Sequence, residues 1–329
     1  MKRTLLIALL FVAGVASSKI AAAFSLAPAA TPDAVVTWNL ITVKATKTAG
    51  LNSNLSTRIE AIEAIAVYDA VNAVKPVGTP YHYHAATKFT ASVQATVAYA
   101  AHAVLVNYFP AQKAGLDSLL SVSVTGITDG KPGQAQLAGE AAAADIIALR
   151  ASDGSSPLTT YAGPANAIAG QYRPTPGKFA PGVDVEWGKV KPFILKDGAQ
   201  FLPEPPPALG SAAYKKALDE VAGLGSTKST LRTDDQTHIA QFYKQDAELT
   251  VNEGARLLAI NNNTPLEKNA LIFALVDIAA ADARIEVWGG KVKSLQSKVW
   301  RLFCYGNGLV SKNHCVIQHH LILQIKTIR

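Results

Sequence analysis

Few residues have the types and spacing that chemistry requires, and the histidines come first. His82 and His84 flank Tyr83 in a segment that follows Pro80. Histidines at alternate positions can share a face and bind one metal ion together. The neighbouring sequence supplies neither a carboxylate nor a third ligand, which such a site would need. We therefore interpret both histidines as ordinary surface residues.

Other polar residues lie inside apolar helical patterns. Asp69 and Asn72 are three residues apart, so they lie on neighbouring parts of one helix face. We expect them to cap or cross-link other helices. His102 lies in an apolar stretch, and His238 follows Asp234 by four residues. Both histidines are expected to be structural.

Several well-known catalytic motifs are missing from the sequence. It contains no Gly-x-Ser-x-Gly segment, no phosphate-binding loop of the Gly-Lys-Ser/Thr kind and no dinucleotide fingerprint. The two cysteines, Cys304 and Cys315, could form one disulfide in an exported protein. The motif search therefore gives no positive indication of an enzyme class.

Residues 1–23 have the order of regions found in a secretory signal. Lys2 and Arg3 precede a short apolar core, and small residues follow it, with a candidate cleavage site near residues 21–23. No later segment is apolar for long enough to span a bilayer. The sequence thus predicts an exported protein, located in the periplasm or outside the cell.

The positive charge is concentrated near the end of the chain. The formal net charge is +7, and the stretch from Arg284 onward, with eight Lys or Arg and one acid, accounts for all of it. A nucleic-acid-binding domain needs a basic face on a folded domain. The rest of the chain is neutral overall, so we do not expect nucleic acid as a partner.

Composition changes abruptly near Gly289. Residues 289–329 contain no Ala, Asp or Glu, although the preceding chain is rich in all three. No Pro/Gly/Ser-rich linker marks the join. One interpretation is a short basic extension that binds a partner. We favour the other, which is that the reading frame has slipped and 289–329 is an aberrant tail after an incomplete domain at 24–288.

The body of the chain is dominated by helical patterns. Apolar residues make up 49% of the sequence, and in RIEAIEAIAVYDAVNAV they recur at spacings of three and four. Residues 35–39, which include Trp38, form a short segment leading into the helical region. We expect helices at 57–74, 90–109, 111–120, 134–150, 211–224, 233–248, 253–260 and 265–288. The Ala run 141–144 should allow helices to approach closely.

Residues 155–209 form a long Pro- and Gly-rich stretch. A loop of this length inside a compact domain is usually functional or follows an ordered path over the surface. Its aromatic residues are spaced as if to anchor it: Phe179, Trp187, Phe193 and Phe201.

Five segments, in order and spacing, carry a resemblance to a known family. They are AIAVYDAVNAV (64–74), AAHAVLVNYFPAQKAGLD (100–117), GEAAAADIIALRASDG (139–154), YRPTPGKFAPGVDVEWGKVKPF (172–193) and ALVDIAAADARIEVW (274–288). Together they resemble the bacterial vanadium-dependent haloperoxidases, in the superfamily that includes type 2 phosphatidic acid phosphatases. The resemblance runs from about residue 36 to residue 288. It implies an all-α helical bundle, here truncated at the C-terminus, with a long Pro/Gly-rich loop.

The resemblance also implies a site for an oxyanion. In the family, vanadate lies among a Lys, two Arg, a Ser-Gly pair and two His, where peroxide binds the metal and a halide is oxidised. The family's Trp-x-x-Lys segment matches Trp288 to Lys291. Arg301 comes later than the family's Trp-Arg-Pro and precedes Leu302 instead of Pro. The Pro-Ser-Gly-His and final Ser-Arg…His segments are absent. Lys291 and Arg301 are at most remnant anion ligands.

We therefore expect a haloperoxidase-like protein that is inactive as written and binds no vanadate. In the intact family the cofactor is vanadate, and the partners are the small molecules halide and peroxide. One alternative is a soluble relative of the acid-phosphatase kind, because the same cage can hold phosphate. Another is a non-catalytic exported scaffold or binding protein with a basic tail. An incomplete bundle should also expose apolar helix faces.

Overall fold

The structure, a computed structural model, describes residues 32–295 except 132, 169, 170, 175 and 203–206. Its helices are α2 (Ala34–Thr48), α3 (Ser53–Val74), α4 (Val93–Tyr108), α5 (Lys113–Val124), α6 (Gln134–Arg150), α7 (Ala212–Gly225), α8 (Asp234–Phe242), α9 (Ala247–Asn261) and α10 (Leu266–Leu295). Short 3-10 helices η1 (Pro110–Gln112) and η2 (Trp187–Lys189) and a hairpin of β1 (Thr160–Tyr161) and β2 (Gly182–Val183) complete the described elements. The expected all-α fold is confirmed.

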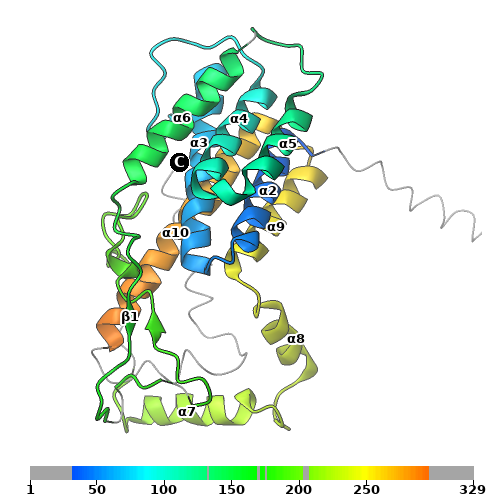
Figure 1. Cartoon of the computed structure of the whole chain (residues 1–329). Helices are drawn as coiled ribbons and strands as arrows, with labels where there is room; N and C mark the ends of the chain where they lie inside the picture. Colours follow the sequence, from blue (N-terminus) through cyan, green and yellow to red (C-terminus); the bar gives the residue numbers. More distant parts are fainter. Residues whose placement is uncertain (1–31, 132, 169–170, 175, 203–206, 296–329) are drawn as a thin grey trace, which may run out of the picture.

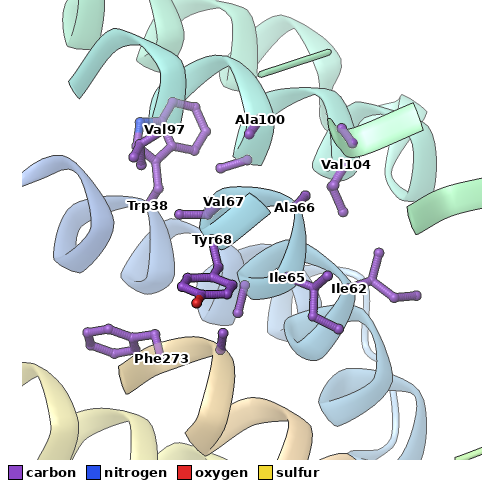
Figure 2. Close-up of a cluster of buried hydrophobic side chains, with 14 of the residues drawn as sticks. Trp38, Ile62, Ile65, Ala66, Val67, Tyr68, Val97, Ala100, Val104 and Phe273 are labelled. Carbon is purple, nitrogen blue, oxygen red and sulfur yellow. The ribbon is translucent and has the colours of Figure 1, made fainter. Parts of the chain in front are cut away.

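Helix α3 forms the centre of the bundle (Figure 1). Every residue of α3 is buried except Ser53 and Leu55. Its apolar side chains pack between α4 on one side and α10 on the other, where Phe273 approaches Tyr68 (Figure 2). A helix that is apolar on most of its circumference must be surrounded by other helices, because no face of it can be left to water. The strong periodicity of this segment is thus explained by burial on all sides.

Helix α2 was not expected, and the sequence-based assignment of its region was wrong. Residues 35–39 belong to a helix of 15 residues that continues to Thr48. The segment AVVTWNLITVKATKT is rich in β-branched residues, which have low intrinsic helix propensity. Tertiary packing outweighs that propensity, because Trp38 is completely buried in the main core. Asp33 caps the helix by accepting the backbone N–H of Val36 at 3.0 Å.

Helices α4 and α6 approach each other closely, as the small residues predicted. A Cβ atom placed on Gly139 would lie 2.7 Å from the backbone N of Ala100 and 2.8 Å from the carbonyl O of Thr96. Ala142 and Ala143 are buried in the same interface. Only small side chains permit this backbone distance, so the sequence of α6 sets how deeply it packs on α4.

The expected helix between Thr233 and Glu248 is two helices. α8 ends at Phe242 and α9 begins at Ala247, so the single-helix prediction was wrong. The predicted polar start is confirmed, because Thr233 and Gln236 form a reciprocal capping box. The second helix is longer than the expected 253–260, and it carries polar residues that become important below.

The expectation that Asp69 and Asn72 cap or cross-link other helices was wrong, because both side chains hold the loop that follows α3. The Asp69 carboxylate accepts backbone N–H groups from Tyr81, His82 and Tyr83 at 2.6 to 2.9 Å. The Asn72 side-chain oxygen accepts two further N–H groups, from residues 77 and 78. These contacts fold the loop back onto its own helix.

The long Pro/Gly-rich stretch is fastened to the bundle by polar groups of α6 and α10. Asp282 accepts backbone N–H groups from three consecutive residues, 193 to 195, at 2.6 to 3.0 Å. The Arg150 guanidinium lies 3.9 Å from the centre of the Phe193 ring and donates to the carbonyl of Lys191 at 2.6 Å. Trp187 is also buried. The loop therefore follows an ordered path.

Only two of the four proposed aromatic anchors are buried. Trp187 and Phe193 are 3% and 7% exposed, whereas Phe179 and Phe201 are 64% and 42% exposed. Aromatic spacing alone cannot show which rings face the bundle. Phe179 and Phe201 are therefore not buried against the bundle as Trp187 and Phe193 are.

Three glycines bring the loop into backbone contact with the last turns of α10. A Cβ on Gly188 would lie 2.4 Å from Gly289, and a Cβ on Gly289 would lie 2.5 Å from the carbonyl O of Gly198. Helix α10 extends past the predicted end at Trp288 and reaches Leu295. Gly289, in this extension, is one of the residues that contact the loop. Among the described residues, no helix has the length and apolar character needed to cross a membrane.

Candidate functional site: a buried carboxylate cluster

Four helices of the bundle bring polar side chains to one interior region, which we call the carboxylate cluster. Its members recur at helical spacing, so each helix presents one polar face to the others. They are Asn39, Thr42 and Thr46 of α2, Glu60 and Glu63 of α3, Glu248, Asn252 and Arg256 of α9, and Asp277 and Arg284 of α10.

Asn252 connects three of these helices. It accepts a hydrogen bond from the Asn39 amide at 2.6 Å and donates to the Asp277 carboxylate at 2.7 Å. Arg256 donates to the Asn39 side-chain oxygen at 2.6 Å. Asn252 is fully buried, and an amide in that position is stable only when its donors and acceptors are matched.

The carboxylates are less completely satisfied than the amides. Arg284 donates to one oxygen of Glu248 at 3.0 Å, and Thr46 donates to one oxygen of Glu60 at 3.2 Å. The second oxygens of Glu60, Glu248 and Asp277 have no hydrogen-bond donor within the part of the chain that the structure describes. Each of these three side chains is 1% exposed. Such orphaned acceptors are costly in a dry interior.

Burial changes the proton affinity of these acids. Burial, reinforced by the nearby Asp277 carboxyl, raises the pKa of Glu63 to about 8. Burial also raises the pKa of Asp277 to about 7, against the lowering effect of the Asn252 hydrogen bond and of Arg256. The pKa of Glu60 is raised well above its ordinary value, first by burial and then by Asp277. The cluster can therefore hold protons near neutral pH.

The raised pKa values of Glu60, Glu63 and Asp277 point to proton binding as the chemistry this cluster supports best. No group of three or more His, Cys, Asp or Glu among residues 32–295, where described, is arranged to hold a metal ion. The sequence analysis missed the cluster, although it contained a signal. Glu60 and Glu63 interrupt the strongest apolar helix at positions where that helix faces the core. When a charged residue occupies a helix position that faces the core, a polar partner on another helix is expected.

The histidines singled out in the sequence lie elsewhere. His82 is partly exposed and contacts Asp145 at 2.5 Å, while His84 is exposed, in agreement with their interpretation as surface residues. His102 contacts Asp117 at 2.8 Å and meets the Trp38 ring edge-on. It is a hydrogen-bonded packing residue, as expected.

The two candidate anion ligands cannot be placed by the structure. The backbone of Lys291 lies in α10, but its side chain lies outside what the structure describes, and so does the whole of Arg301. The well-buried arginines that are described have structural partners. Arg58 and Arg150 both pair with Asp153 at 2.7 Å. Arg58 and Arg150 are thus engaged by a carboxylate and by backbone carbonyls.

Comparisons with known proteins agree with the fold. No family model matches the chain, and no curated protein matches its sequence. The structure is similar to that of the first bacterial vanadium-dependent iodoperoxidase, with a TM-score of 0.63 and 17% identity, covering 89% of this chain and 80% of that one. Apo and holo structures of a bacterial vanadium-dependent chloroperoxidase give TM-scores of 0.56 and 0.52 at 16% and 14% identity. Both chloroperoxidase alignments cover 74% of this chain. They cover 63% of the apo chloroperoxidase chain and 62% of the holo chain, so this chain spans less than two thirds of their length. The described helices therefore have the fold of the vanadium-dependent haloperoxidases.

Proposed function

We propose that this chain is a haloperoxidase-like protein that provides the helical scaffold of such an enzyme but, as written, does not oxidise halide. The observation that carries the proposal is the shared fold, which extends over 89% of the chain in the iodoperoxidase comparison. The same helices also contain four of the five segments through which the sequence resembles the family. Catalysis belongs to a local site and not to the fold, so the two parts of the proposal need separate support.

The inactivity part rests on the chemistry of anion binding. Vanadate and phosphate are held by guanidinium and ammonium groups that are free to donate to the oxyanion. Arg58 and Arg150 donate to Asp153 and to backbone carbonyls, and Arg284 is paired with Glu248. Lys291 and Arg301 are the remaining candidates from the family pattern, and without the Pro-Ser-Gly-His and Ser-Arg…His segments they do not make a complete cage.

A peroxidase assay tests the proposal. The purified full chain is incubated with vanadate, hydrogen peroxide and, in turn, iodide, bromide and chloride. We expect no halide oxidation above the protein-free background. The matched control is a chain translated from the same gene with the frame restored near codon 289. If the chain as written oxidises halide in a vanadate-dependent reaction, and this activity remains after dialysis, the proposed inactivity is wrong. Hydrolysis of a phosphate monoester by the same sample would favour the phosphatase alternative.

A non-catalytic binding role is the second candidate, and one observation favours it. Helices α7 and α8 contain no buried residue, and apolar side chains such as Leu218, Leu231 and Phe242 are exposed on or between them. The exposed apolar side chains would suit a partner with apolar groups, and the basic composition of 289–329 would suit acidic groups on it. Binding that weakens with salt and disappears when 289–329 are deleted would support this role. If the deletion leaves partner binding unchanged, residues 289–329 do not contribute to the binding role.

We also propose that the protein is exported, on the basis of the leader pattern in residues 1–23, which lie outside the described residues. Mass spectrometry of the protein from fractionated cells checks this directly. A mature N-terminus near residue 24 in the extracytoplasmic fraction is expected. An intact Met1 in the cytoplasmic fraction would contradict export.

A further inference from the structure

Helix α9 is attached to the bundle mainly through polar residues. Its buried residues are Glu248, Asn252 and Ala259, and only the last is apolar. Leu257 and Leu258 are 54% and 64% exposed, so they bury little surface against the bundle. The usual source of helix attachment is burial of an apolar face, worth about 25 cal/mol per Å². For α9 that source is limited to Ala259 in the core and to Ala255 and Ile260, which are only partly buried against it, and the carboxylate cluster adds to it.

The polar contacts of α9 reach two neighbouring helices. Asn252 binds Asn39 of α2 and Asp277 of α10, and Arg256 binds Asn39 as well. Glu248 binds Arg284 of α10. Each contact crosses a helix interface, so the alignment of α9 depends on the protonation and charge of these groups.

The charges within the cluster do not balance when every acid is ionised. Four carboxyls, those of Glu60, Glu63, Glu248 and Asp277, share the interior with the two guanidinium groups of Arg256 and Arg284. Two negative charges would then lack a counter-charge in a region from which water is largely excluded, at a cost of several kcal/mol each by general estimates. Protonated carboxyls remove that excess. They also supply O–H donors, which the orphaned oxygens of Glu60, Glu248 and Asp277 need.

We propose that the carboxylate cluster is a proton-dependent latch: with two protons bound it holds α9 against the bundle, and loss of these protons releases α9. The charged groups inside the cluster are Glu60 and Glu63 from α3, Glu248 and Arg256 from α9, and Asp277 and Arg284 from α10, while α2 contributes the neutral Asn39, Thr42 and Thr46. At the start of α9, Asp246 pairs with Lys47 of α2 and is influenced by Arg284, and the exposed Glu253 lies beside Arg256.

The direction of the effect follows from linkage. A buried acid whose pKa is raised binds its proton more tightly when α9 is closed than when α9 is open and hydrated. The closed state is therefore favoured at low pH, and this advantage is lost as pH rises towards about 8, the pKa of Glu63. Once α9 opens, α8 and α7 are free to follow, because neither has a buried residue to hold it.

Hydrogen exchange of the full chain, measured by mass spectrometry from about pH 5 to about pH 9 and corrected for intrinsic rates, tests the latch. We expect protection of α9 (247–261) to fall by up to about tenfold per pH unit for each proton released, and so by up to about a hundredfold for the two protons of the latch. Protection of α4, which supplies no charge to the cluster, serves as the internal reference and should fall less.

Two variants and one control separate the latch from general instability. Glu63→Gln and Asp277→Asn keep the side-chain shape but remove the titration, so each should flatten the pH dependence of α9 protection. Glu220→Gln, an exposed acid on α7, should retain the dependence of the unaltered chain. The proposal is overturned if α9 and α4 lose protection in parallel, or if both variants retain the original slope. If neither variant folds, the α9 and α4 profiles of the unaltered chain still decide.

Discussion

The bundle of α2 to α6 with α10 and the arm of α7 to α9 are built in different ways. In the bundle, α3 is buried along nearly its whole length, and its side chains, such as Ile62, pack with Trp38 of α2 and Phe273 of α10 (Figure 2). In the arm, α7 and α8 lie away from the bundle (Figure 1) and have no buried residue, whereas α9 lies beside α2 and makes polar contacts with α2 and α10. Apolar packing stabilises the bundle. In the arm, the attachment of α9 depends on polar and charged contacts, and the apolar side chains of α7 and α8 are largely exposed.

The largest expected difference concerns apolar truncation. Phe273→Ala in the bundle should lower the free energy of unfolding by about 3–5 kcal/mol, because it removes a side chain that is 2% exposed from the core. Leu218→Ala on α7 should change it by no more than about 0.5 kcal/mol, because Leu218 is 39% exposed. Urea unfolding followed by circular dichroism measures both. Equal losses would mean that the arm packs as tightly as the bundle.

Glycine substitutions should act with opposite sign in the two regions. Gly139→Ala places a methyl group against backbone atoms of α4 and should destabilise the protein by about 1–3 kcal/mol. Gly254→Ala in α9 meets nothing within 4 Å and should stabilise that helix by about 0.5–1 kcal/mol. Thermal melts of the two variants compare them. A stabilising Gly139→Ala would show that α4 and α6 lie further apart than described.

Stability should also depend on pH. The raised pKa values of Glu63 and Asp277 mean that the folded state binds more protons than the unfolded state between their ordinary values and about pH 8. Their contribution to stability is therefore present at low pH and lost as pH rises, by up to about 1.4 kcal/mol per pH unit for each group. Glu63→Gln should become more stable than the parent chain towards pH 8. Unfolding free energies that rise from pH 5 to pH 8 equally in both chains would contradict this assignment.

The sequence predicted helices best where a local pattern, such as apolar periodicity or a run of small residues, determines the structure. Helices α3 and α6 follow apolar periodicity and small-residue patterns, and both were predicted within a few residues. Helix α2 was missed because its β-branched residues favour helix only when tertiary packing requires it. The carboxylate cluster was missed because it joins residues as far apart as Asn39 and Arg256, and no local pattern records such a contact.

The loop anchors illustrate the same limit. Trp187 and Phe193 are buried and Phe179 and Phe201 are exposed, and aromatic spacing in the sequence did not separate the two pairs. The residues that fasten the loop, Arg150 and Asp282, lie on helices before and after it. The buried positions of the loop are therefore set by residues on neighbouring helices, and the loop sequence alone does not predict them.

Vanadate binding is the most direct test of the central claim, that the fold is present without a working oxyanion cage. Equilibrium dialysis of the full chain against vanadate, beside the frame-restored chain, measures it without depending on turnover. We predict no bound vanadate above the level of an unrelated basic protein for the chain as written, and stoichiometric binding for the restored chain. Stoichiometric, phosphate-displaceable vanadate on the chain as written would contradict the account, and Lys291→Ala and Arg301→Ala would then be the first variants to examine.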